Sequence, residues 1–224
     1  MEFFLDTASI DDITELCALF PITGVTTNPS ILLKDKANFW PTLTNIRRLI
    51  GERQLHVQVT GTSVGDIERE ADAIVSRLGH NTYIKIPVNM IGLQAISLLK
   101  DKGYYVTGTA IYFASQAILA AQAGADYIAP YFNRMNNNGV DASATIKTVS
   151  KLLIRDKLPC KILGASFKNT NQLVEALESG AQAVTASPEL MRSMVTNPLI
   201  EHAILNFNAD WTNTNGTLKI FGLD

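Results

Sequence analysis

Short runs of apolar and β-branched residues alternate along the chain with longer segments in which apolar residues recur every three or four positions. This alternation predicts repeated strand–helix units around a parallel sheet, because strands covered by helices are apolar along most of their length. Eight segments have the length and composition of such strands: residues 2–6, 24–27, 55–60, 82–88, 104–109, 127–131, 161–166 and 183–185.

The segments between the predicted strands have the periodicity of helices that lay one apolar face on the sheet. Five of them are the clearest: residues 67–78, 93–101, 113–123, 144–156 and 172–178. Ser9 followed by Asp12 resembles a capping box, which begins a helix. Glycines stand where helix C-caps are expected, at Gly79, Gly103, Gly124 and Gly180.

Eight alternating units in 224 residues favour a closed (β/α)₈ TIM barrel over an open doubly wound sheet. Neither a Gly-x-Gly-x-x-Gly fingerprint nor a Walker loop favours the open sheet. We therefore expect one α/β domain over residues 1–224. The tail over residues 206–224 changes character, with Trp211, a polar stretch, and Ile220 and Phe221. It is either a docked helical arm, which is a candidate for oligomerisation, or a frayed terminus.

The composition excludes several kinds of partner. A net charge of −2 provides no basic surface field for a nucleic acid or an anionic membrane. No apolar run reaches the roughly 18 residues of a membrane span, and the first residues do not resemble a secretory signal. Cys17 and Cys160 are far apart in a chain that needs no disulfide, so both are expected to be reduced. These features predict a soluble cytoplasmic protein that acts on small molecules.

Lys85 interrupts an apolar strand, because it stands in the middle of TYIKIPV. With the two-residue period of a strand, Tyr83 and Lys85 point into the barrel while Ile84 and Ile86 face the helices. Burial penalises an ammonium group, so the pKa of such a lysine falls below its reference of about 10.4. A neutral amine forms a Schiff base with a carbonyl substrate. The alternative is a lysine that reaches solvent or takes part in a structural ion pair.

Other predicted strands end in polar residues that share this inward direction. They are Asp6, Gln58, Thr109 and Tyr131. Chemistry in this fold gathers at the C-terminal ends of the strands, so we expect these four side chains near Lys85 as catalytic residues. A single aspartate at a strand end is more often a turn or helix-cap residue. The prediction of a catalytic role therefore depends on the convergence of all four side chains.

Cationic and hydroxyl groups follow the sixth and seventh predicted strands. Arg134 stands in YFNR, and Ser166 and Lys168 stand in GASFK. Barrel enzymes commonly bind phosphate at the loops after the late strands, so these three residues predict a phosphate site. The alternative is that they are ordinary solvated surface residues.

The histidines and cysteines predict no metal centre. His56, His80 and His202 are scattered, and neither a His-Glu-x-x-His nor a Cys-x-x-Cys motif occurs. A metal-dependent aldolase or isomerase is therefore disfavoured. His56 shares the inward direction of Gln58 but lies two residues earlier, so it is expected deeper in the barrel with a structural role.

The segment GVTTNPSI at residues 24–31 is similar to a signature of the transaldolase family. Further matching segments cover nearly the whole chain, at residues 5–7, 85–88, 108–110, 129–131, 133–134 and 165–168. The length and spacing resemble the short subfamily that contains fructose-6-phosphate aldolases and small transaldolases. The resemblance implies a (β/α)₈ barrel, a lysine Schiff base, no metal or organic cofactor, sugar-phosphate substrates and a homo-oligomer, commonly a decamer.

The resemblance also implies roles for individual residues. Lys85 would be the Schiff-base lysine, Asp6 the acid/base at the bond being cleaved, and Thr109 a group that orients a catalytic water. Substrate would be bound by Thr26 and Asn28, which contacts donor hydroxyls, and its phosphate by Arg134, Ser166 and Lys168. Asn89 and Ile91 depart from the family pattern in the loop after the lysine strand, which puts substrate preference in doubt.

The pair of Gln58 and Tyr131 resembles the aldolases of this family, since transaldolases tend to carry Glu and Phe there. We therefore expect a class I aldolase that cleaves fructose 6-phosphate to dihydroxyacetone and glyceraldehyde 3-phosphate, or runs the reverse addition. The alternative is a transaldolase of the pentose phosphate pathway that transfers a dihydroxyacetone unit between sugar phosphates. A Schiff-base aldolase for another sugar phosphate and a non-catalytic sugar-phosphate-binding barrel are more distant alternatives.

Overall fold

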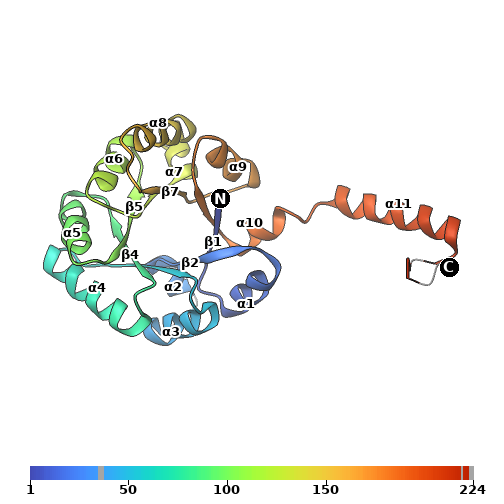
Figure 1. Ribbon diagram of the computed structural model, residues 1–224, viewed down its shortest axis with the longest axis horizontal. Coiled ribbons are helices and arrows are strands. Elements are labelled where there is room, and N and C mark those ends of the chain that lie inside the picture. The colour runs from blue at the N-terminus through green and yellow to red at the C-terminus, as the bar shows by residue number, and fades with distance from the viewer. Residues whose placement is uncertain (35–37, 218, 222–224) are drawn as a thin grey trace. The chain divides into compact units, whose positions relative to one another are not determined.

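The computed structural model describes residues 1–34, 38–217 and 219–221, and its central feature is a closed barrel of parallel strands (Figure 1). Neighbouring strands pair in sequence order, and β1 closes the barrel against β8. The strands are β1 (Glu2–Asp6), β2 (Ile22–Thr26), β3 (Gln54–Gln58), β4 (Thr82–Pro87), β5 (Tyr105–Ile111), β6 (Tyr127–Pro130), β7 (Lys161–Gly164) and β8 (Ala183–Ala186). The predicted (β/α)₈ barrel is confirmed.

The long helices that precede β8 surround the strands on the outside of the barrel (Figure 1). All five segments predicted as helices form, as α4, α5, α6, α8 and α9. The helices are α1 (Ile10–Leu19), α2 (Pro29–Lys34), α3 (Phe39–Ile50), α4 (Val64–Leu78), α5 (Met90–Asp101), α6 (Ala114–Gln122), α7 (Phe132–Asn137), α8 (Ala142–Arg155), α9 (Thr170–Glu178), α10 (Pro188–Ser193) and α11 (Pro198–Asn215).

Local sequence signals explain where several elements begin and end. The Ser9 side chain accepts a hydrogen bond from the backbone N–H of Asp12 and caps α1, as predicted. Gly79 follows α4 with a φ of 85°, a backbone conformation that side chains with a Cβ disfavour. Gly24 has another role, since a Cβ there would lie 2.2 Å from the carbonyl oxygen of Gln54. This glycine allows β2 to approach β3 closely.

Aromatic rings fill the lower part of the barrel interior. Phe4, Tyr83 and Tyr127 lie in one buried cluster, with His56 packed among their rings. In the register of β3 and β4, His56 pairs with Tyr83, and two residues later Gln58 pairs with Lys85. Lys85 therefore stands nearer the C-terminal ends of the strands than the aromatic cluster. The aromatic cluster therefore lies directly beneath the polar residues at the C-terminal ends of the strands.

The chain separates into two compact units, residues 1–188 with the barrel and residues 189–224 with α11. The expectation of one domain over residues 1–224 stays a prediction. The predicted C-terminal arm is helical and begins before residue 206, at Pro198. Cys17 and Cys160 are free thiols, as expected. Within the described residues, no helix is long and apolar enough to cross a membrane.

Candidate active site

Lys85 is buried inside the barrel on β4, with 5% of its surface exposed. Its amine Nζ donates a hydrogen bond to the backbone carbonyl of Thr27 at 2.8 Å. Burial lowers the pKa of Lys85 below its ordinary value, and the negative charge of Asp6 opposes this shift. The amine is thus in an environment that favours the neutral, nucleophilic form.

Asp6 ends β1, and its carboxylate is linked to two threonines from other strands, directly to Thr26 and through it to Thr185. The hydroxyl of Thr26 donates to Oδ1 of Asp6 at 2.6 Å, and the hydroxyl of Thr185 lies 2.7 Å from that of Thr26. A threonine hydroxyl has one proton to donate. Because Thr26 donates its proton to the carboxylate, Thr185 is the donor to Thr26. The three residues form a directed chain from β8 through β2 to the carboxylate on β1.

A cavity of about 90 Å³ at the C-terminal ends of the strands brings most of the predicted residues together. Seven of the ten line it: Asp6, Asn28, Lys85, Thr109, Tyr131, Arg134 and Ser166. The other lining residues are Ala129, Leu163, Ala165 and Thr185. Thr26 is fully buried and reaches the cavity through its hydrogen bond to Asp6.

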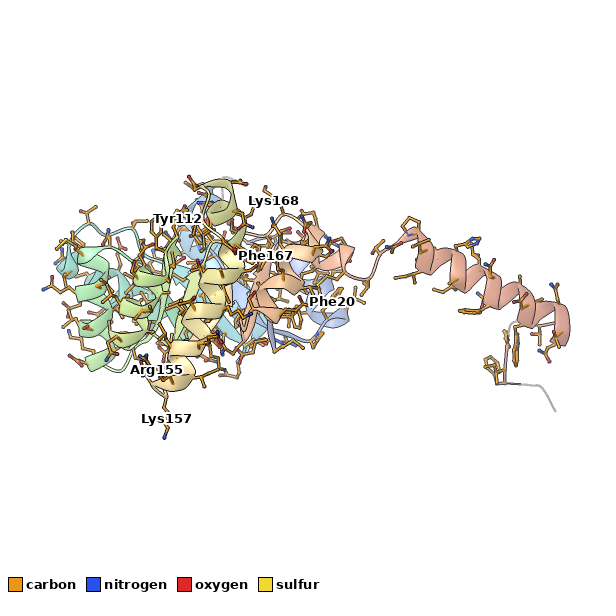
Figure 2. All side chains as sticks on the ribbon, turned by 90° about the horizontal axis from the view of Figure 1, so that it is seen from above. Phe20, Tyr112, Arg155, Lys157, Phe167 and Lys168 are labelled. Carbon is orange, nitrogen blue, oxygen red and sulfur yellow. The ribbon has the colours of Figure 1, made fainter. Side chains whose placement is uncertain are left out.

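Gln58 and Lys168 do not line this cavity. Gln58 lines a separate, largely apolar cavity of about 430 Å³ with residues of α2, α3 and α4, among them Leu32, Trp40 and Ile74. Lys168 is exposed on the loop after β7, where its backbone N–H donates to the side chain of Gln172. Figure 2 shows Lys168 at the same end of the barrel as Tyr112, opposite Arg155 and Lys157.

The loops after β6 and β7 are joined by backbone hydrogen bonds. The N–H of Phe132 donates to the carbonyl of Ala165 at 2.8 Å, and the N–H of Asn133 donates to that of Ser166 at 3.1 Å. Ser166 has a φ of 63°, which is uncommon for a residue with a side chain and is typical of functional sites. These contacts hold Arg134 and Ser166 at one cavity.

Arg134 is exposed and is held by two tyrosines. Its guanidinium lies beside the hydroxyl of Tyr112, which raises the pKa of Arg134. The guanidinium carbon lies 4.8 Å from the ring centre of Tyr131. The hydroxyl of Tyr131 in turn lies 3.2 Å from that of Thr109. Arg134 is therefore positioned by neutral groups, and its charge remains free to bind an anion.

His56 lies below Lys85 and is fully buried, which agrees with its predicted depth. Its Nδ1 is 2.9 Å from the hydroxyl of Thr107, and its Nε2 is 3.1 Å from Oε1 of Gln54. Burial, and then the positive charge of Lys85, hold the pKa of His56 well below its ordinary value. Among the residues that the structure describes, no three acidic, histidine or cysteine side chains gather as metal ligands.

The family model described as Transaldolase/Fructose-6-phosphate aldolase matches residues 3–222. The chain belongs to this family. A relative from Streptococcus pneumoniae, named "Probable fructose-6-phosphate aldolase", is 42% identical over 213 residues, which are 94% of this chain and 96% of the relative. The resemblance inferred from the motifs at residues 24–31, 85–88 and 165–168 is confirmed, and this chain is an enzyme of the aldolase and transaldolase type.

Of the two departures from the family pattern, Asn89 lies in the loop that leads from β4 into α5, and Ile91 lies in the first turn of α5. The side chain of Asn89 accepts a hydrogen bond from the N–H of Gly92 at 2.8 Å and caps the helix. Ile91 is 40% exposed on the first turn. Asn89 therefore has a local structural role that its residue type explains, whereas nothing in the structure explains Ile91.

Two residues of this family member's site were not predicted from its sequence. Thr185 is the penultimate residue of β8, and the strand-end argument that identified Asp6 would have found it. Tyr112 follows β5, and its role depends on a contact with Arg134 that no sequence spacing reveals. Each of them contacts a predicted residue: Thr185 contacts Thr26, and Tyr112 contacts Arg134.

Proposed function

We propose that the chain is a class I aldolase that cleaves fructose 6-phosphate to dihydroxyacetone and glyceraldehyde 3-phosphate, and catalyses the reverse addition. The observation that carries this proposal is the buried amine of Lys85 in a cavity shared with the carboxylate of Asp6. The name of the 42% identical relative supports the same activity.

In the first step Lys85 attacks the C2 carbonyl of the sugar as a neutral amine. Loss of water from the carbinolamine leaves an iminium, which is an electron sink. The lowered pKa of Lys85 favours this step, because a larger fraction of the amine is neutral near pH 7. The hydrogen bond to the carbonyl of Thr27 gives the amine a fixed position before substrate binds.

Cleavage of the C3–C4 bond requires removal of the proton on the C4 hydroxyl. Asp6 accepts this proton, the C4 oxygen becomes the aldehyde of glyceraldehyde 3-phosphate, and the bonding electrons pass to the iminium to form an enamine. The chain of Thr185 and Thr26 orients the carboxylate, since Thr26 donates to one of its two oxygens. The other oxygen remains available to the substrate hydroxyl.

The enamine then takes a proton at C3, and water hydrolyses the resulting iminium to release dihydroxyacetone. Tyr131 and Thr109 supply hydroxyls in the cavity, 3.2 Å apart, that can donate to and accept from this water. Gln58 is proposed to assist them by family resemblance. On the substrate, Asn28 binds donor hydroxyls, and Arg134 and Ser166, with Lys168 at the rim, bind the phosphate.

Transaldolase activity is the second candidate, because the description of the family names both activities. The same enamine would then attack an aldehyde such as erythrose 4-phosphate before it is protonated. Release of dihydroxyacetone from fructose 6-phosphate alone distinguishes the two. We expect measurable release without an added acceptor, and less of it in Tyr131→Phe, which lacks the phenol. A strict requirement for erythrose 4-phosphate would assign the chain as a transaldolase.

The Schiff base itself is tested by reduction with borohydride in the presence of dihydroxyacetone. The expected result is a covalent adduct that peptide mapping locates on Lys85, and no adduct in Lys85→Met. Full activity in Lys85→Met, or no adduct in the active wild-type enzyme, would contradict the mechanism and favour a barrel that only binds sugar phosphates.

We also propose that the chain assembles with copies of itself in the cytoplasm. No residue of α11 is buried, yet apolar side chains recur along it at Ile200, Ile204, Phe207 and Trp211. These positions fall on one face of the helix, which is the pattern of a helix that packs on a protein surface. A second copy of this chain is the proposed partner, in agreement with the homo-oligomers, commonly decamers, of the family.

A further inference from the structure

Tyr112 contacts both of the residues that surround the proposed phosphate position. Its hydroxyl lies beside the guanidinium of Arg134 and raises the pKa of that group, and its ring meets the ring of Tyr131 edge to face, with centres 5.7 Å apart and planes at 72°. Arg134 lies over the same Tyr131 ring at 4.8 Å. The three side chains therefore form a closed triangle in which each touches the other two.

Arg134 has no acidic partner among the ion pairs found in residues 1–34, 38–217 and 219–221. A long exposed arginine without such a partner normally samples many rotamers, and ordering it costs conformational entropy. The two tyrosines restrict the guanidinium to one place without neutralising it. An anion that binds there does not have to order the arginine first.

Tyr112 is itself held by Gln116, the third residue of α6. Oε1 of Gln116 accepts hydrogen bonds from the backbone N–H groups of Tyr112 at 2.9 Å and Phe113 at 3.2 Å. Its Nε2 donates to the carbonyl of Val88 at 2.8 Å and to that of Ala110 at 3.4 Å. One side chain thus joins the end of β5, the loop after β5 and the loop after β4.

The bonds from Gln116 lie at an irregular part of the barrel. The register of β5 and β6 shifts between Gly108 and Ile111, and Ala110 has a φ of 55°. A residue with a Cβ adopts this conformation only at a cost, so the surrounding contacts must maintain it. Gln116 bonds to Ala110 within the irregularity and to Tyr112 and Phe113 after it, and so fixes where the chain leaves β5. That exit determines where the Tyr112 side chain lies.

We propose that Tyr112 and Gln116 are positioning residues that set the preference of the enzyme for phosphorylated over unphosphorylated aldehydes. Tyr112 holds the guanidinium of Arg134, and Gln116 holds the backbone of Tyr112. This inference rests on the proposed function, because it assumes that Arg134 binds the phosphate of the substrate. Neither residue touches the reacting carbon atoms in this scheme.

The central variant is Tyr112→Phe, which keeps the ring and removes only the hydroxyl beside Arg134. Its matched control is Tyr104→Phe, which also removes a tyrosine hydroxyl, one that bonds to Asp72 on the outer surface of the barrel. The first measurement is the calorimetric dissociation constant of glycerol 3-phosphate, an analogue without a carbonyl. We expect Tyr112→Phe to raise this constant about threefold to tenfold, and Tyr104→Phe to leave it unchanged.

The second measurement is a double-mutant cycle with Arg134→Ala. If Tyr112 acts through Arg134, adding Tyr112→Phe to Arg134→Ala should cause no further loss of glycerol 3-phosphate binding. An unchanged dissociation constant in Tyr112→Phe, or an equal loss with and without Arg134, would overturn the proposal. Both measurements are independent of turnover, so an enzyme without aldolase activity would refute the proposed function and still test this inference.

Kinetics supply a readout that a purely structural role would not move. For addition of dihydroxyacetone, the KM ratio of glyceraldehyde to glyceraldehyde 3-phosphate should fall in Tyr112→Phe and in Gln116→Leu. Gln116→Leu leaves four backbone groups without their partner, so it is judged by this ratio and not by its absolute activity. Equal increases of both KM values in Tyr112→Phe would show that the residue only supports the fold.

Discussion

His56 makes the stability of the barrel depend on pH in a way that can be calculated. The ring is fully buried and stacked on Tyr83, with ring centres 4.5 Å apart and an angle of 6° between the planes. Both ring nitrogens are hydrogen-bonded, to Thr107 and Gln54, and the charge of Lys85 disfavours a second cation nearby. The native state therefore keeps His56 neutral at a pH where the unfolded chain binds a proton.

The sign and size of the effect follow from this difference. Because the pKa of His56 is lowered on folding, its contribution to stability is complete above the unfolded pKa of about 6.5 and is lost as the pH falls below it. One proton corresponds to about 1.4 kcal/mol per pH unit. Between pH 7.5 and pH 5.0 the free energy of unfolding should thus fall by about 2 kcal/mol through this residue alone.

The assay is urea unfolding of the wild type and of His56→Phe at the two pH values. At pH 7.5 the variant should be less stable by about 1–3 kcal/mol, because the polar atoms of Thr107 and Gln54 lose their partner. At pH 5.0 this gap should be smaller by about 2 kcal/mol, since the carboxylates titrate equally in both proteins and cancel. A gap that stays constant would refute the argument. Replacing the exposed His80 by Gln is the control.

Further predictions concern the amine, the carboxylate and the assembly. The kcat/KM for fructose 6-phosphate should rise with pH through a midpoint below 10.5, since burial lowers the pKa of Lys85 and only the neutral amine attacks; a midpoint at or above 10.5 would contradict this. In steady-state assays, Thr185→Val should reduce kcat by about threefold to tenfold because Thr26 loses its donor, with recovery in Thr185→Ser. The double variant Phe207→Ser with Trp211→Ser should lower the oligomer mass measured by light scattering, and an unchanged mass would contradict the proposed role of α11.

The alternation of short and long apolar segments was sufficient to predict the barrel, because the strands are buried along most of their length and each long helix buries one face. The prediction was weakest at helices and strand ends whose limits depend on contacts with distant parts of the chain. Helix α3 was not predicted, although its buried residues Leu43, Ile46 and Ile50 have helical spacing. The prediction ended the fifth strand at Thr109, whereas β5 continues through the irregularity at Ala110. The side chain of Gln116 bonds to the carbonyl of Ala110 in that irregularity, and this contact could not be predicted from the sequence.

Most of the candidate site followed from two rules, inward direction on a strand and position at its C-terminal end. These rules placed Asp6, Lys85 and Thr109 correctly at one cavity. Gln58, which the same rules place beside Lys85, is the exception. Gln58 lines the neighbouring cavity although it pairs with Lys85 in the sheet.

Tyr131 connects the two halves of the proposed chemistry. Its hydroxyl, 3.2 Å from that of Thr109, belongs to the proton-transfer side, while its ring carries the guanidinium of Arg134 on the phosphate side. A phenylalanine at this position would keep the second role and lose the first. The exchange of tyrosine for phenylalanine that the resemblance implies between the aldolases and transaldolases of this family would therefore change the fate of the enamine without disturbing the proposed phosphate site. In the proposed mechanism, such a separation would let one barrel supply either activity with the same Lys85 and Asp6.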